Sequence, residues 1–192
     1  MRRLLIALLI LVPGAALAFD DTPATPRVGV LRQAGDLIHH DALVADSVHR
    51  FLGEELRDRG LDAFDARATY AEAVEDGYAD ADYLIEVVSV ADGGEYGGVG
   101  LGGPHGGVEL SLSVARVLAE VRIYDGRTYE LIASEDLRKR SKAVLPTALA
   151  IGGRRSWLSL AVPIAQWAQY RNVARAAARD AASRITATIA ER

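Results

Sequence analysis

The chain has 192 residues, half of them hydrophobic, and a formal net charge of −4. This length fits one domain plus a targeting segment, and the apolar content supports a packed core and excludes global disorder. The acidic balance argues against general nucleic-acid binding, because phosphate contacts need clustered cations. Cysteine is absent, which excludes disulfides, thiolate metal sites, a cysteine nucleophile and the lipid-modified cysteine of bacterial lipoproteins.

The first 18 residues have the pattern of a secretory signal peptide. Arg2 and Arg3 precede an apolar run, Leu4–Val12, and Ala16-Leu17-Ala18 is a small-x-small cleavage site. The run is too short to span a bilayer, so we expect cleavage after Ala18 and a periplasmic or secreted protein. An uncleaved membrane anchor is the alternative. Residues 19–26 are polar with two prolines and are expected to form a flexible lead.

The expected single domain covers residues 27–192 and opens with a short strand at residues 27–31. A helix is predicted next, capped by Asp36 or Asp41 and ended by Gly60, because apolar side chains recur at helical spacing. These apolar residues are Val44, Val48, Phe51, Leu52 and Leu56.

Two shorter elements follow this helix. Residues 61–64 are expected to form a short edge strand. Thr69 and Glu72 have the spacing of a capping box, in which each side chain binds the other residue's backbone N–H. This spacing predicts a short helix that ends near Gly77.

The centre of the domain is predicted to be an antiparallel unit of three strands. Tyr83–Val90 is apolar and β-branched, and Val108–Tyr124 begins with strict apolar/polar alternation, so both segments predict strands. Asp125-Gly126 is a hairpin turn signal. Thr128–Leu137 is expected to return as the third strand.

The last part of the chain combines an interrupted apolar stretch with a long helix. Ala143–Trp157 contains Pro146 and Gly152-Gly153, and we predict a loop or a short helical turn there. Pro163 is acceptable in the first turn of a helix, and the many alanines after it favour helix formation and close packing. The predicted packing face of this helix consists of Ile164, Trp167, Tyr170, Ala174, Ala177, Ala181, Ile185 and Ile189.

The segment Gly93–Gly107 contains nine glycines in 15 residues. A phosphate-binding loop would place backbone N–H groups at a helix N-terminus. Here the segment leads into a strand, no Gly-Lys-Ser/Thr follows, and the glycine spacing lacks the strand–loop–helix context of a dinucleotide site. We interpret the segment as a hairpin tip that contacts a partner or a membrane, or else as slack. The side chains available for contact are Tyr96, Val99, Leu101 and His105.

Other polar motifs also have structural explanations. His39 and His40 lie near two aspartates, but adjacent residues point in different directions, so we do not expect them to share a metal ion. No serine stands in a Gly-x-Ser-x-Gly elbow, so no hydrolase triad is predicted.

Two basic clusters flank the interrupted apolar stretch. The first is Arg138-Lys139-Arg140 with Lys142, and the second is Arg154-Arg155 before Trp157. With the apolar run between them, they form either a membrane-surface or partner-binding edge, or a sheet end beside a buried loop.

The order of elements up to Ala79-Asp-Ala-Asp-Tyr-Leu-Ile-Glu-Val87 resembles a known α/β domain. The curli secretion-channel lipoprotein, the penicillin-binding-protein activator lipoprotein and the amino-terminal domain of TolB share that domain. The similarity covers residues 27–140 and the last helix. It implies a non-catalytic role in the bacterial envelope, either docking on a partner or assembling in the outer membrane, and it carries no catalytic residues. The missing lipidated cysteine departs from the lipoproteins of the group.

We therefore expect an α/β (α+β) domain. Its sheet is mixed or antiparallel with about four or five strands, helices on one face, a long glycine-tipped hairpin and a long C-terminal helix. The leading hypothesis is a non-catalytic exported binding or accessory protein of the bacterial envelope. An oligomerising structural or outer-membrane-associated subunit comes second, and an enzyme of unknown reaction third.

The expected partner is an envelope protein, with membrane-surface contact and self-association left open and nucleic acid excluded. No cofactor and no metal site are expected. The predicted contact residues are Tyr96, Val99, Leu101, His105, Arg154, Arg155 and Trp157.

Overall fold

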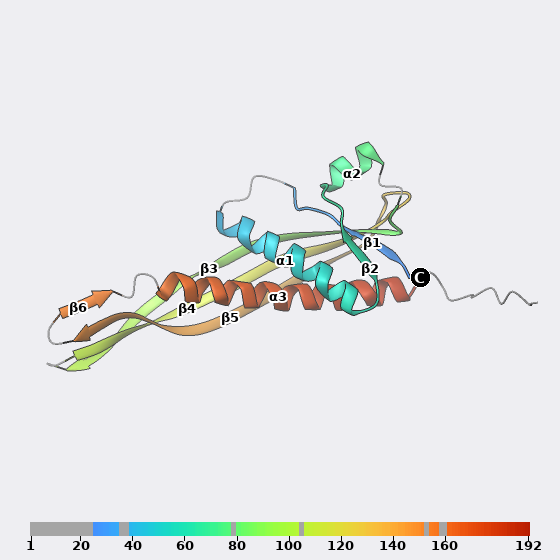
Figure 1. The fold of residues 1–192 in the computed structure, drawn as a ribbon. Helices are drawn as coiled ribbons and strands as arrows, with labels where there is room; N and C mark the ends of the chain where they lie inside the picture. The colour runs from blue at the N-terminus through green and yellow to red at the C-terminus, as the bar shows by residue number, and fades with distance from the viewer. Residues whose placement is uncertain (1–24, 35–38, 78–79, 104–105, 152–153, 158–160) are drawn as a thin grey trace, which may run out of the picture.

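The computed structural model describes residues 25–34, 39–77, 80–103, 106–151, 154–157 and 161–192. It contains one six-stranded sheet and three helices in an α/β arrangement (Figure 1). In chain order the elements are β1 (Arg27–Val30), α1 (His39–Asp58), β2 (Asp62–Asp65), α2 (Tyr70–Asp76), β3 (Tyr83–Gly103), β4 (Gly106–Asp125), β5 (Leu131–Ile151), β6 (Arg154–Trp157) and α3 (Ala161–Ala190).

The sheet is mixed, with strand order β2-β1-β3-β4-β5-β6. β1 pairs in parallel with β2 and β3, and β3 to β6 form an antiparallel meander. The predicted α/β class, the edge position of β2 and the central antiparallel unit are confirmed. The expected strand count was too low, because part of the predicted loop after Ala143 forms β6.

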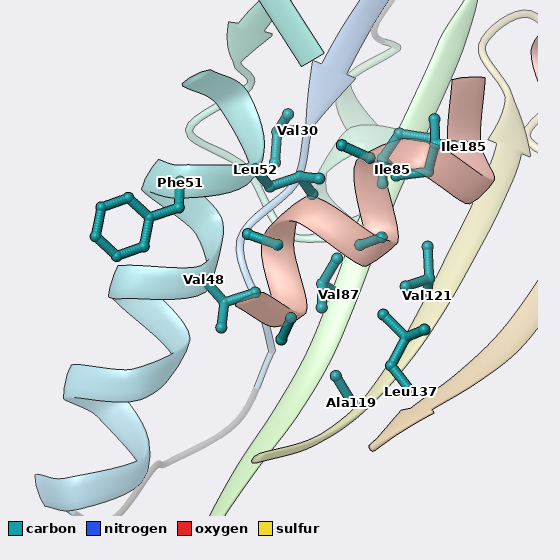
Figure 2. Close-up of a cluster of buried hydrophobic side chains, with 14 of the residues drawn as sticks. Val30, Val48, Phe51, Leu52, Ile85, Val87, Ala119, Val121, Leu137 and Ile185 are labelled. Carbon is teal, nitrogen blue, oxygen red and sulfur yellow. The ribbon is translucent and has the colours of Figure 1, made fainter. Parts of the chain in front are cut away.

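α1 and α3 lie side by side on one face of the sheet (Figure 1). Figure 2 shows Val48 and Leu52 of α1 and Ile185 of α3 gathered over the strands. All three side chains are at most 1% exposed, as the helical spacing predicted for α1. This stripe of apolar side chains against the sheet is the main hydrophobic core, and its burial is the dominant favourable term in folding.

The prediction that all helices share one face is wrong. Leu84 and Ile85 are consecutive residues of β3, so their side chains point to opposite faces of the sheet. Ile85 belongs to the core under α1 and α3, whereas Leu84 packs with Ala73 of α2 on the other side. The predicted capping box of α2 is present, with the Thr69 N–H donating to Glu72 Oε2 at 2.7 Å.

The glycine-rich segment is not the expected loop. β3 and β4 stay paired from Gly93 and Ala115 out to Gly103 and Gly106, with one register shift between Tyr96 and Gly98. Residues 104–105, at the turn, lie outside the described residues. The hairpin itself is confirmed, but the glycines belong to its strands.

A close approach of two backbones explains one pair of these glycines. A Cβ added to Gly102 would lie 2.8 Å from Gly107 Cα, and one added to Gly107 would lie 2.7 Å from Gly102 Cα. Real Cβ contacts do not come this close, so the pairing at this level requires glycine on both strands.

The prediction of a loop or helical turn at Ala143–Trp157 is also wrong. Residues up to Ile151 continue β5, and Arg154–Trp157 returns as β6. Pro146 is tolerated within β5 because it sits opposite Leu110, beside a register shift. Irregular positions of this kind are where strands accept proline.

The helix ends depart from the sequence expectations in two places. α1 begins at His39, so Asp41 lies inside the helix and cannot be its cap; Asp36 lies outside the described residues. α3 contains Pro163 in its first turn, as predicted, but Ile164 is 67% and Trp167 50% exposed. Their predicted burial fails because α3 begins farther along the strands than α1 does, so no second helix covers these turns (Figure 1).

Candidate functional site

The strands β3, β4 and β5 extend far beyond the short parallel strands (Figure 1). β1 pairs only with Tyr83–Ile85 of β3. We call the extension the distal sheet: residues 93–103 of β3, 106–117 of β4, 138–151 of β5, and β6. The face opposite α1 and α3 is called the uncovered face.

The register of the strands determines which side chains share the uncovered face. Ala115 and Val117 of β4 belong to the core under the helices, so their even-numbered neighbours point away from it. From the middle of the sheet outward, the rows on the uncovered face are Val90, Leu118 and Arg138; Asp92, Arg116 and Arg140; Val114 and Lys142; Leu112 and Val144; and Val99, Leu110 and Pro146.

The middle rows are basic. Arg138, Arg140 and Lys142 occupy alternate positions of β5, so they point to the same face, and each is exposed. Arg116 lies beside this series and pairs with Asp92 at 3.2 Å. Within the described part of the chain, no carboxylate forms an ion pair with the three β5 cations. They are therefore available to an anionic partner.

The outer rows are apolar. Val99 is 64% exposed, Leu101 57% and Val144 62%. Scattered exposed apolar residues are normal on protein surfaces, but a contiguous group is typical of an interaction site. On the uncovered face, apolar rows thus adjoin the basic rows directly.

On the opposite face, polar contacts hold the start of α3 to the distal sheet. The Ser113 hydroxyl donates to Gln169 Oε1 at 2.8 Å, and the Gln169 amide donates to the Ser141 carbonyl at 3.1 Å. Gln169 is only 6% exposed. α3 is therefore anchored at the distal sheet, although Ile164 and Trp167 remain exposed there.

A network of charged side chains lies on the uncovered face at the end away from the distal sheet. The buried Glu86 carboxylate accepts hydrogen bonds from the Tyr124 hydroxyl at 3.2 Å and from Arg122 at 3.3 Å. Burial, with the Glu86 charge, raises the pKa of Tyr124 to about 12. Hydrogen bonds from Arg122 and Ser134 lower the pKa of Glu120 to about 2. Because these carboxylates are bound by donors, we interpret the network as structural.

A cleft of about 260 Å³ lies beside α1, at the end of β1. His49 Nε2 lies 3.2 Å from the Val30 carbonyl oxygen and 3.6 Å from Asp65 Oδ1. Gln33 binds the backbone of Ser89 through both its amide oxygen and its nitrogen, at 2.7 and 3.1 Å. The Gln33 amide and the His49 ring are thus engaged within the chain. The lining comprises Val30, Leu31, Arg32, Gln33, Ala42, Ala45, Asp46, His49, Asp65 and Val87.

The predicted contact residues fall into three groups. Val99 and Leu101 lie in β3 with exposed side chains. Tyr96, Arg154, Arg155 and Trp157 occupy positions in β3 and β6, but their side chains lie outside the described part of the structure. His105 lies outside the described residues altogether.

The structure adds contact candidates that the sequence analysis did not single out. Val144 shares the uncovered face with the predicted residues, and Leu112 is its cross-strand neighbour. The spacing of Arg138, Arg140 and Lys142 at every second residue was the available signal, but it has meaning only once β5 is known to be a strand.

Two global properties complete the description. Among the described residues, no group of three or more His, Cys, Asp or Glu side chains is placed to hold a metal ion. None of the helices in the described ranges is both long and apolar enough to span a membrane.

No protein-family model and no curated protein matches this chain. A solved structure with a similar fold is a protein described as a homolog of neuraminyllactose-binding hemagglutinin from Helicobacter pylori. Its TM-score is 0.50 at 10% identity, covering 86% of this chain and 84% of that one.

Two further solved structures are similar at lower scores. A hypothetical protein from Chlamydia trachomatis has a TM-score of 0.48 at 11% identity, covering 88% of this chain and 100% of that one. A minor lipoprotein from Acinetobacter baumannii has a TM-score of 0.40 at 13% identity, covering 85% of this chain and 91% of that one. At these identities the similarity concerns the fold.

Proposed function

We propose that this chain is an exported, non-catalytic accessory protein of the bacterial envelope that binds its partner through the distal sheet. One observation carries the proposal: the uncovered face presents basic rows next to apolar rows. Val144 and Leu101 are more than half exposed there. A chain that only needed a stable core would bury such side chains or replace them with polar ones.

The predicted signal peptide supports the proposed location outside the cytoplasm. Leu4–Val12 and Ala16-Leu17-Ala18 favour cleavage before Phe19 and a periplasmic or secreted protein. The similarity in fold to the Helicobacter pylori protein is compatible with an envelope role. The resemblance to the domain of the curli channel and TolB points to the same class.

An oligomerising subunit is the second candidate, and the free edge of β3 favours it. β1 pairs with β3 only as far as Ile85. Gln33 binds the backbone at Ser89, and from Gly93 outward the outer edge of β3 has no strand neighbour among the described residues. An open edge presents unpaired N–H and C=O groups, which a second strand can bind. An enzyme, the third hypothesis, would have its site in the cleft at His49.

Photo-crosslinking in the native cell tests the proposal. A photoreactive residue at Val144 reports on the distal sheet. The same residue at Leu131 is the matched control, because Leu131 also lies in β5 and is 55% exposed.

We expect adducts with an envelope component from position 144 and none from position 131, in protein whose amino terminus is Phe19. Protein retained in the cytoplasm with Met1 intact, or equal adducts from both positions, would contradict the proposal.

A further inference from the structure

The charge of this chain is divided between its two ends. Residues 93–117 and 138–178 hold nine of the 22 Lys and Arg residues but only two of the 26 Asp and Glu, a net charge of +7. The whole chain has a net charge of −4, so the remainder carries −11. These two segments contain the distal sheet and the first half of α3, so the basic end of the molecule is the distal one (Figure 1).

Exposed apolar side chains occur on both sides of this basic end. Val99, Leu101 and Val144 lie on strands of the distal sheet, and Ile164 and Trp167 lie on α3 across the sheet. A flat protein partner seated on the uncovered face would leave the two α3 side chains in water. A soft medium that surrounds the end would cover all five.

We propose that the distal sheet docks on an anionic lipid bilayer, which names the partner within the function proposed above and rests on it. Arg138, Arg140 and Lys142 contact headgroup phosphates, and the apolar residues beyond them enter the interfacial layer. Basic side chains next to a bilayer and aliphatic and tryptophan side chains at the interface are the two contributions that hold proteins on membrane surfaces.

A second copy of the chain is less well matched to this surface. Two distal sheets meeting symmetrically would bring two regions of +7 net charge together, and like charges repel. A head-to-tail contact between a basic and an acidic end avoids that repulsion, so the test includes it as an outcome.

Vesicle sedimentation tests the inference with the purified exported form. The protein should sediment with vesicles of phosphatidylcholine containing about 30% phosphatidylglycerol and stay in solution with phosphatidylcholine alone. Raising the salt from about 50 to about 500 mM should release it, because salt screens surface charges. The tryptophan emission should shift to shorter wavelength on binding, and Trp167→Phe should remove part of that shift.

A matched pair of triple variants separates local contact from net charge. Arg138→Gln/Arg140→Gln/Lys142→Gln should lower the vesicle partition coefficient about a hundredfold, since each cation near an anionic surface contributes about a factor of five. Arg67→Gln/Arg127→Gln/Arg192→Gln removes the same charge elsewhere and should change the coefficient less than about twofold.

Four results would overturn the lipid inference: no sedimentation with anionic vesicles, equal sedimentation with both vesicle types, equal loss in both triple variants, or self-association without lipid that the first triple variant abolishes. If position 144 still crosslinks to an envelope protein in such a case, the proposed function stands without the lipid. Loss of the crosslink as well would remove both.

Discussion

Leu52 provides the sharpest test of how the core is assembled. Its side chain is 0% exposed and belongs to the cluster formed by α1, α3 and the sheet (Figure 2). Truncation to alanine removes apolar volume worth about 0.8 kcal/mol per methylene, or about 2.4 kcal/mol. The cavity adds to this cost, because surrounding side chains close only part of it. We expect Leu52→Ala to lower the free energy of unfolding by about 3–4 kcal/mol.

Urea denaturation followed by circular dichroism measures this change. The transition midpoint should fall while its slope stays constant, as expected for a change in stability alone. Leu43→Ala is the matched control, since Leu43 lies on the same helix and is 55% exposed. It should cost less than about 0.5 kcal/mol. Arg57 is a poorer control, because its side chain donates to the Ala63 carbonyl at 2.9 Å. Equal costs for the two leucines would show that the packing face of α1 is misassigned.

Three further predictions concern single positions. Gly102→Ala should destabilise the distal hairpin, whereas Gly100→Ala should not, because a Cβ added at Gly102 meets the backbone of β4 and one added at Gly100 meets nothing within 4 Å. Hydrogen exchange of the β3 and β4 amides measures the difference, and equal exchange in both variants would refute the close pairing. Thr69→Ala should cost about 1 kcal/mol by loss of the helix cap, read from the urea midpoint; no change would mean that the capping box of α2 contributes nothing. The pKa of Glu120 is lowered from 4.5 to about 2 in the folded protein, so its ionised carboxylate stabilises the fold above pH 4.5, and this stabilisation is lost as the pH falls toward 2. The stability difference between wild type and Glu120→Gln should therefore shrink on acidification. A difference independent of pH would contradict this.

Local signals in the sequence were enough for the elements near the short strands. The capping box at Thr69 depends only on residues three positions apart, and the apolar spacing of α1 identified Val48 and Leu52 correctly. The turn after Asp125 is likewise local, since its carboxylate accepts from the N–H groups of Arg127 and Thr128. Such features need no knowledge of distant partners.

The distal sheet was missed because strand pairing there is decided by distant residues. Glycine has low strand propensity, so Gly93–Gly103 has no strand signal of its own. Its partner strand does have one: the alternation that begins at Val108 belongs to β4, and a long β4 needs equally long neighbours on both sides. The same reasoning would have extended β5 past Pro146, where the proline argued locally for a break.

The surroundings of the predicted contact residues were missed for the same reason. Val99 and Leu101 were expected in a hairpin tip, whereas the structure places them in β3 with exposed side chains; their contact role stays a prediction. In the sequence, Arg138, Lys139, Arg140 and Lys142 form one basic cluster. In β5 their side chains are divided between the two faces of the sheet. Lys139 points to the helix side, where it pairs with Asp180 of α3 at 3.1 Å, whereas its two neighbours face outward.

Hydrogen–deuterium exchange in the presence of isolated envelope membranes tests most directly whether the distal sheet is the contact surface. Without membranes, the outer-edge amides of β3 and β5 should exchange quickly, because no described strand pairs with residues 93–103 or 131–146 on those edges. Adding membranes should slow exchange in residues 99–103 and 138–146 and leave α1 unchanged. Slower exchange around His49 and Val30, with an unchanged distal sheet, would contradict the account and place the contact surface at the cleft.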